Sequence, residues 1–209
     1  MIAINGDKIM TMGEFGVIDN GIILVDGEFI HKVGQEIDIP PGSTVIDAGG
    51  KYICPGFIDT HTHIGLGEEI YQIEGDDVNE SSDPITPQLQ AVDGVNFMDL
   101  AFSDALRGGV TRTMCMPGSA NVLGGQAVFL KTLAASPSNM VYRNSCGLKA
   151  ALGENPKRVY KAQSKTPKTR MASASLLREA LSVARSLLDK EDIKYREAYK
   201  NAAIFQVLR

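Results

Sequence analysis

The nine residues from Pro55 to His63, PGFIDTHTH, constrain this chain more than any other stretch. Successive side chains of a β-strand point to opposite faces, so a strand over Phe57 to His63 would place Asp59, His61 and His63 on one face. Two imidazoles on one rigid strand form a ready pair of ligands for zinc, iron, nickel or copper. The stretch therefore predicts a strand that ends in a metal site.

The composition is that of a globular protein. The chain has 209 residues, enough for one domain or for one domain with a smaller companion, and 44% hydrophobic with 22% charged residues permits a real core. The net charge of −4 gives no reason to expect nucleic acid or a membrane as a partner, and no apolar run has the length of a transmembrane helix. No secretory signal is visible, and the odd number of cysteines (Cys54, Cys115 and Cys146) fits reduced thiols. We therefore expect a cytoplasmic protein.

Residues 1–56 are predicted to form a small antiparallel β-sandwich unit. Asp26-Gly27-Glu28 stands between the β-rich runs 21–25 and 29–33, which is a strong hairpin signal. A third run at 44–47 follows a Pro-Pro-Gly turn, and these short, half-polar runs favour a sandwich over a parallel core. His31 lies inside the hairpin without acidic or cysteine neighbours, so we interpret it as an ordinary strand residue.

Residues 57–209 change to an alternation of strands and helices, which predicts a parallel sheet. Strands are expected over 57–63, 110–116, 126–131 and near 145–150, and helices over 93–107, 172–190 and 192–209. The segment 64–92 is rich in acidic residues, and this composition predicts a long, solvated surface loop rather than a metal site. The segment 154–170 is polar and rich in Lys and Arg. This composition predicts an exposed connection or, alternatively, a cover loop that attracts an anionic substrate.

The whole pattern resembles the amidohydrolase superfamily of metal-dependent hydrolases, in its imidazolonepropionase and prolidase-type branch. The resemblance rests on PGFIDTHTH and on the stretches 108–111, 116–121 and 124–126. It implies the N-terminal half only: the first three to four βα units of a (β/α)₈ TIM-type barrel over 57–209, after the N-terminal part of a composite β-sandwich over 1–56. A complete barrel takes roughly 250 residues, more than 57–209 provide. The implied reaction is hydrolysis of a C–N amide or cyclic amide bond by metal-activated water.

The resemblance also implies the site. His61 and His63 would bind a divalent metal, zinc first among the candidates, as one or two ions. In this superfamily an acidic residue or a carboxylated lysine often bridges a second metal, and Glu154 and Lys149 are the candidates here. Glu154 is preferred because it needs no modification. The loop at 117–126 is predicted to contact the substrate, with Ser119, Asn121 and Gln126.

The sequence lacks part of such a site. No histidine follows His63, so further ligands and the general base are expected outside this chain. A half barrel exposes strand edges, which predicts a second copy of the chain or a complementary C-terminal half as partner, besides a small-molecule amide substrate. The alternative is a catalytically inactive fragment, or a partner-dependent half-barrel with no activity of its own.

Overall fold

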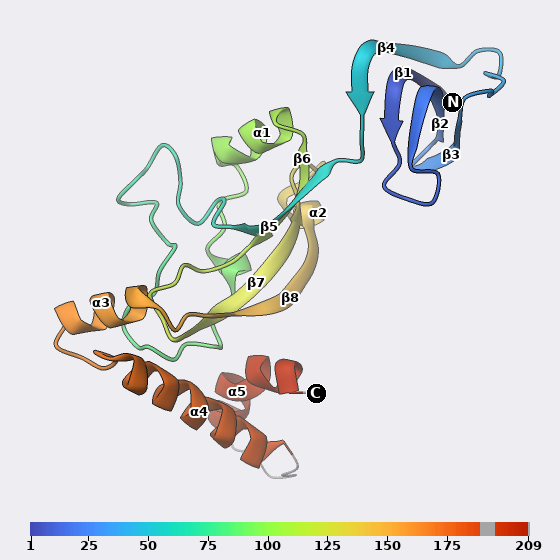
Figure 1. Cartoon of the computed structure of the whole chain (residues 1–209). Helices are drawn as coiled ribbons and strands as arrows, with labels where there is room; N and C mark the ends of the chain where they lie inside the picture. The colour runs from blue at the N-terminus through green and yellow to red at the C-terminus, as the bar shows by residue number, and fades with distance from the viewer. Residues whose placement is uncertain (189–194, 209) are drawn as a thin grey trace. The chain divides into compact units, whose positions relative to one another are not determined.

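The computed structural model in Figure 1 describes residues 1–188 and 195–208, without the side chains of 195–199, 207 and 208. Two compact units make up the chain, Met1–Gly56 and Phe57–Arg209. None of the helices within the described ranges is long and apolar enough to cross a membrane.

The first unit is one four-stranded sheet with the strand order β3-β2-β1-β4. Its strands are β1 (Ile2–Met10), β2 (Val17–Asp26), β3 (Phe29–Gly34) and β4 (Thr44–Ile53). The predicted hairpin is confirmed, because β2 and β3 are antiparallel and Asp26 pairs with Phe29. Gly27 in the turn has a φ of 58°, a conformation that glycine adopts without steric cost.

The other edge of this sheet corrects the sequence analysis. β4 pairs with β1 in parallel, with Ile2 opposite Thr44, so the prediction of an antiparallel unit is wrong for this pair. The cause is the connection at 35–43, which carries the chain from β3 past β2 and β1 to the opposite edge of the sheet. β4 therefore runs in the same direction as β1. Buried Ala3, Ile9 and Leu24 form the core side of the single sheet. Its place in a composite sandwich stays a prediction.

The second unit is built on a sheet with the order β5-β6-β7-β8. Its strands are β5 (Phe57–Thr62), β6 (Val110–Cys115), β7 (Leu123–Lys131) and β8 (Val141–Ala150), all within one or a few residues of the predicted strands. β5 and β6 are parallel, but β7 is antiparallel to both β6 and β8. The prediction of a parallel sheet is therefore wrong for β7, because the loop at 116–122 is too short for the crossover that a parallel return requires. The partial barrel stays a prediction.

The helices begin and end where local chemistry allows. They are the single 3₁₀ turn η1 (Ala91–Asp93), α1 (Leu100–Arg107), α2 (Pro137–Met140), α3 (Glu154–Ala162), α4 (Arg170–Leu187) and α5 (Tyr195–Leu208). α1 begins later than predicted, at the Asp99 cap, whose carboxylate accepts from the Ala101 N–H. It ends as predicted at Gly108 and Gly109, and Gly109 has a φ of 84°.

Two of the C-terminal predictions fall partly outside the described residues. α4 confirms most of the helix predicted at 172–190, but 189 and 190 are not described. α5 confirms a helix within 192–209, whereas 192–194 and 209 are not described, nor are the side chains of Tyr195 and Tyr199. Ala203 is buried as predicted, whereas Ala202 is exposed.

α3 overturns the prediction that 154–170 is an exposed connection. Pro156 and Tyr160 lie one helical turn apart and are both buried, so the segment has an inner side despite its many basic residues. The acidic segment 64–92 is a loop, as predicted, but it is anchored by buried Ile64 and Leu66. These two side chains pack with Phe102 of α1, Cys115 of β6 and Val128 of β7 in the main core of this unit.

Candidate metal centre

β5 delivers the two predicted histidines to one end of the sheet. His61 lies near the end of β5 and His63 directly follows it. Their ring centroids are 5.7 Å apart and the rings are nearly perpendicular, at 89°. Asp59, predicted to share their face, accepts a hydrogen bond from the backbone N–H of His61 at 3.0 Å, which steadies the end of the strand.

The ring of His63 has a fixed orientation. Its Nδ1 lies 2.7 Å from the carbonyl oxygen of Met116, just after β6. A carbonyl can only accept, so Nδ1 carries the proton of the neutral ring. Nε2 then presents a lone pair, the form of imidazole that binds a metal. Sequence reasoning missed this contact, because the partner is a backbone atom and any residue type at position 116 could supply it.

His61 meets Lys149 near the end of β8. The Lys149 Nζ lies 3.1 Å from the His61 Nε2. An ammonium group can only donate, so Nε2 of His61 accepts this hydrogen bond with its lone pair and carries no proton. Burial lowers the pKa of Lys149 below the ordinary value for lysine, because the ammonium loses hydration. Lys149 was the second of the two predicted bridging residues.

The contact between His61 and Lys149 requires a curved sheet. β5 and β8 are the first and last strands in the order of the sheet. Neighbouring strands lie about 4.8 Å apart, so a flat sheet would separate these two by roughly 14 Å. Side chains on a flat sheet stand perpendicular to it and would not meet. The sheet therefore curls toward the face that carries both residues, which are 88 positions apart in the chain.

Glu154, the preferred candidate for the bridge, has a different environment. It is the first residue of α3, its side chain is 83% exposed, and its carboxylate lies 2.6 Å from the Lys157 Nζ. The hydrogen bond from Lys157 lowers the pKa of Glu154, and the charge of Lys157 adds to this shift. Over the described ranges, no group of three or more His, Cys, Asp or Glu side chains could hold a metal, so Glu154 does not join the two histidines in one. Its role as a ligand stays a prediction.

The predicted substrate residues have partners within the protein. Asn121 is buried, donates to the Thr86 hydroxyl at 2.7 Å and accepts from the Tyr160 hydroxyl at 2.6 Å. Gln126 is also buried and donates to the carbonyl of Pro87 at 3.2 Å. Asn121 thus links the loop at 84–88 to α3, and Gln126 links the same loop to β7, so both amides are already engaged.

Ser119 is the more accessible of the three predicted contacts. Its hydroxyl accepts a hydrogen bond from the Asn155 side chain at 2.6 Å, which ties the loop after β6 to the first turn of α3. A role of Ser119, Asn121 or Gln126 in substrate binding stays a prediction. Tyr160 had no signal in the sequence, since a tyrosine in a basic stretch gives no hint that it is fully buried.

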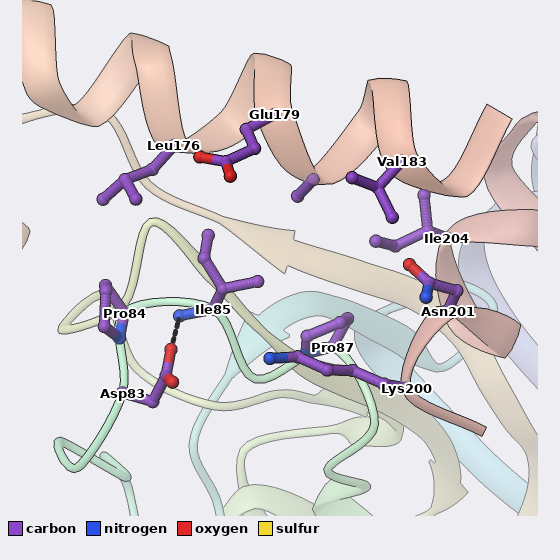
Figure 2. Close-up of a pocket in the computed structure, with 11 residues that line it drawn as sticks. Asp83, Pro84, Ile85, Pro87, Leu176, Glu179, Val183, Lys200, Asn201 and Ile204 are labelled. Carbon is purple, nitrogen blue, oxygen red and sulfur yellow. Dashed lines mark hydrogen bonds between the residues drawn. The ribbon is translucent and has the colours of Figure 1, made fainter. Parts of the chain in front are cut away.

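A separate apolar cavity of about 550 Å³ lies between the loop at 83–87, α4 and α5 (Figure 2). Figure 2 shows Ile85, Leu176, Val183 and Ile204 converging on it, with Glu179 and Lys200 at its border. None of the predicted site residues lines this cavity. The histidine pair is therefore a candidate metal centre because of its chemistry, and its role as a metal ligand stays a prediction.

Comparisons with known proteins identify the superfamily. No protein-family model matches the chain. The crystal structure of an amidohydrolase from Thermotoga maritima MSB8 has a TM-score of 0.90 and 35% sequence identity, over 100% of this chain and 56% of that one. The Amidohydrolase tasK of Hapsidospora irregularis is 32% identical over 186 residues, 82% of this chain and 19% of that protein. An Imidazolonepropionase of Pseudomonas paraeruginosa is 37% identical over 57 residues, 26% of this chain and 14% of that protein.

The fold and the histidine pair thus define one class of protein. The chain belongs to the amidohydrolase superfamily. It spans about half of the Thermotoga chain and a fifth or less of the two curated relatives.

Proposed function

We propose that this chain provides part of the metal centre of an amidohydrolase that cleaves a C–N amide or cyclic amide bond. The observation that carries the proposal is the 3.1 Å contact between the Lys149 Nζ and the His61 Nε2, beside a His63 whose Nε2 is free. A divalent ion, zinc by preference and as one or two ions, would lower the pKa of a bound water to about 7 and polarise the amide carbonyl.

The donor set fits such an ion once Lys149 is modified. A charged ammonium beside His61 would repel a cation. Carbon dioxide can add to the neutral Lys149 amine: a new N–C bond forms, one proton leaves, and the product is an anionic carbamate. Two imidazole nitrogens and one carboxylate-like group then make the three protein ligands typical of a catalytic zinc site. Lys149 thus replaces Glu154 as the favoured bridging residue.

His63 is positioned for this role by the chain itself. The carbonyl of Met116 holds Nδ1, which sets the tautomer and the direction of Nε2. Ser119, on the loop after β6, is the favoured substrate contact of the three predicted residues, because it is only partly buried whereas Asn121 and Gln126 are buried.

Metal analysis of the purified 209-residue chain tests the proposal. We expect stoichiometric zinc in the wild type and its loss in His61→Ala and His63→Ala. His31→Ala is the matched control, because it removes the third histidine, in the other unit, and should retain the metal. Native mass spectrometry should find one carbon dioxide adduct that Lys149→Ala lacks. Zinc that is unaffected by both histidine substitutions would refute the assignment.

The second candidate is a half-barrel that works only with a partner. β5 is an edge strand in the described sheet, and Phe57 and Ile58 on it are 58% and 56% exposed. Exposed apolar side chains on a strand edge favour association. We propose that a complementary C-terminal half or a second copy of the chain covers this edge and supplies the general base. Light scattering tests this: a monodisperse monomer that hydrolyses amides would overturn it.

A further inference from the structure

A basic hollow of about 620 Å³ lies on the outer side of α3. It is lined by Glu154, Lys157, Arg158, Lys161, Ala162 and Lys168. The buried Pro156 and Tyr160 fix the inner side of the helix and so determine which side chains face outward. Lys157 and Lys161, four positions apart, are neighbours on that outer side. One side of α3 therefore forms most of the lining of the hollow, and its basic side chains are held at fixed positions relative to one another.

The positive charges of this hollow are not balanced by acidic side chains among the described residues. Glu154 is its one acidic residue, and it pairs with Lys157 at 2.6 Å. Among the described residues, the Arg158 guanidinium donates to the neutral Asn155 side chain, at 3.1 Å, and to no carboxylate. The side chains of Lys161 and Lys168 make no hydrogen bond or ion pair within the described part of the chain.

Such a concentration of positive charge costs stability unless something offsets it. Like charges four positions apart destabilise a helix. The chain as a whole carries a net charge of −4, so this surface is basic on an acidic protein. The Lys157 side chain is only 17% exposed, and a partly dehydrated ammonium interacts more strongly with an anion than a fully solvated one.

We propose that the hollow binds a small molecule with two or more negatively charged oxyanion groups, either carboxylates or phosphates. Its volume falls within the range of about 300 to 1,000 Å³ that is typical of small-molecule sites, larger than one isolated oxyanion needs. The three cations that have no acidic partner in the described ranges, Arg158, Lys161 and Lys168, can each donate charge-assisted hydrogen bonds to such a ligand. The proposal goes beyond the proposed hydrolysis, because it requires neither a metal nor a reaction.

Calorimetric titration of the full chain with citrate and with tripolyphosphate, at neutral pH and low salt, tests the site. We expect one equivalent of at least one of them to bind, with an affinity that falls as salt is added. Lys161→Gln and Lys168→Gln should each weaken binding about tenfold, the loss of one hydrogen bond to a charged group. Lys51→Gln is the matched control, since it removes the same charge from an exposed residue of the other unit and should leave the affinity unchanged.

Glu154→Gln separates ligand binding from a merely structural role of these residues. It removes the one negative charge at the hollow and releases Lys157, so the affinity for the anion should rise. Binding of only one probe identifies the carboxylate or the phosphate as the ligand chemistry. The proposal is overturned if neither probe binds, if Lys51→Gln weakens binding as much as Lys161→Gln, or if only an RNA oligonucleotide binds.

Discussion

Two lysines close together in the sequence have opposite environments, and the contrast explains their different chemistry. Lys149, near the end of β8, faces the neutral ring of His61 and has a lowered pKa because it is partly buried. Lys157, in α3, faces the carboxylate of Glu154. Burial favours loss of the Lys149 proton, so Lys149 is suited to modification as an amine. Lys157 is paired with Glu154, and the neighbouring cations without an acidic partner among the described residues, such as Lys161, are suited to binding anions.

The largest effect is expected from removing the Lys149 amine, with Lys157 as its comparison. Lys149→Ala should weaken zinc binding more than about 100-fold, since even indirect partners of a metal contribute 10- to 100-fold. Lys157→Ala should leave the zinc affinity unchanged. Glu154→Gln should also leave it unchanged, because Lys149 and not Glu154 is the proposed bridging residue. Dialysis against zinc buffers measures all three affinities. Acetate should partly restore zinc binding to Lys149→Ala by replacing the missing carboxylate. An equal loss of zinc affinity in Lys149→Ala and Lys157→Ala would contradict the different roles of the two lysines.

A smaller effect is expected at the buried contact that holds α3, the helix of Lys157, against the loop before β7. Tyr160→Phe leaves the Asn121 oxygen without its donor and should lower the free energy of unfolding by about 1 to 3 kcal/mol. Denaturant melts at neutral pH measure the difference. An unchanged midpoint would mean that α3 is held by apolar packing alone.

The same residue predicts a response to alkaline pH. Burial, followed by the charges of Asp83 and Glu80, raises the pKa of Tyr160 to about 12. The unfolded chain releases this proton near pH 10, before the folded one does, so the contribution of Tyr160 to stability is lost as pH rises from about 10 to about 12. In Tyr160→Phe the decline over this interval should be shallower. Parallel slopes for the two proteins would contradict the assignment.

The smallest effect is expected at the exposed ion pair. Glu154 has a lowered pKa, so it contributes stability above the pKa of an unfolded glutamate, about 4.3, and loses it as pH falls through the folded value. Glu154→Gln should therefore be slightly less stable than the wild type at neutral pH and equal to it in acid. Thermal melts across this range test the expectation, and a difference that persists in acid would point to lost packing instead.

The sequence predicted those features that depend on local chemistry. The hairpin turn at Gly27, the strand that carries His61 and the end of α1 at Gly109 follow from backbone preferences of a few residues. The direction of β7 was missed, because strand propensity is the same in both directions and only the length of the loop before it excludes a parallel return.

The candidate site shows the same limit. The approach of Lys149 to His61 depends on the curvature of a whole sheet, which no local pattern encodes. The type of a polar residue also does not reveal its partner: Asn121 could have faced a ligand, but it is enclosed by Thr86 and Tyr160. α3 was hidden because its many charged residues outnumber its two buried ones.

Cys115 gives this protein a built-in chemical reporter. The thiol is fully buried in β6, donates to the carbonyl of Ile64 at 3.1 Å, and has a pKa raised to about 12 by burial. Alkylating reagents attack the thiolate, so the folded protein protects Cys115 from them almost completely. Iodoacetamide labelling of Cys115 can be distinguished from that of Cys54 and Cys146 by peptide mapping. The rate of Cys115 labelling would measure how often the core between β6 and the segment at Ile64 opens.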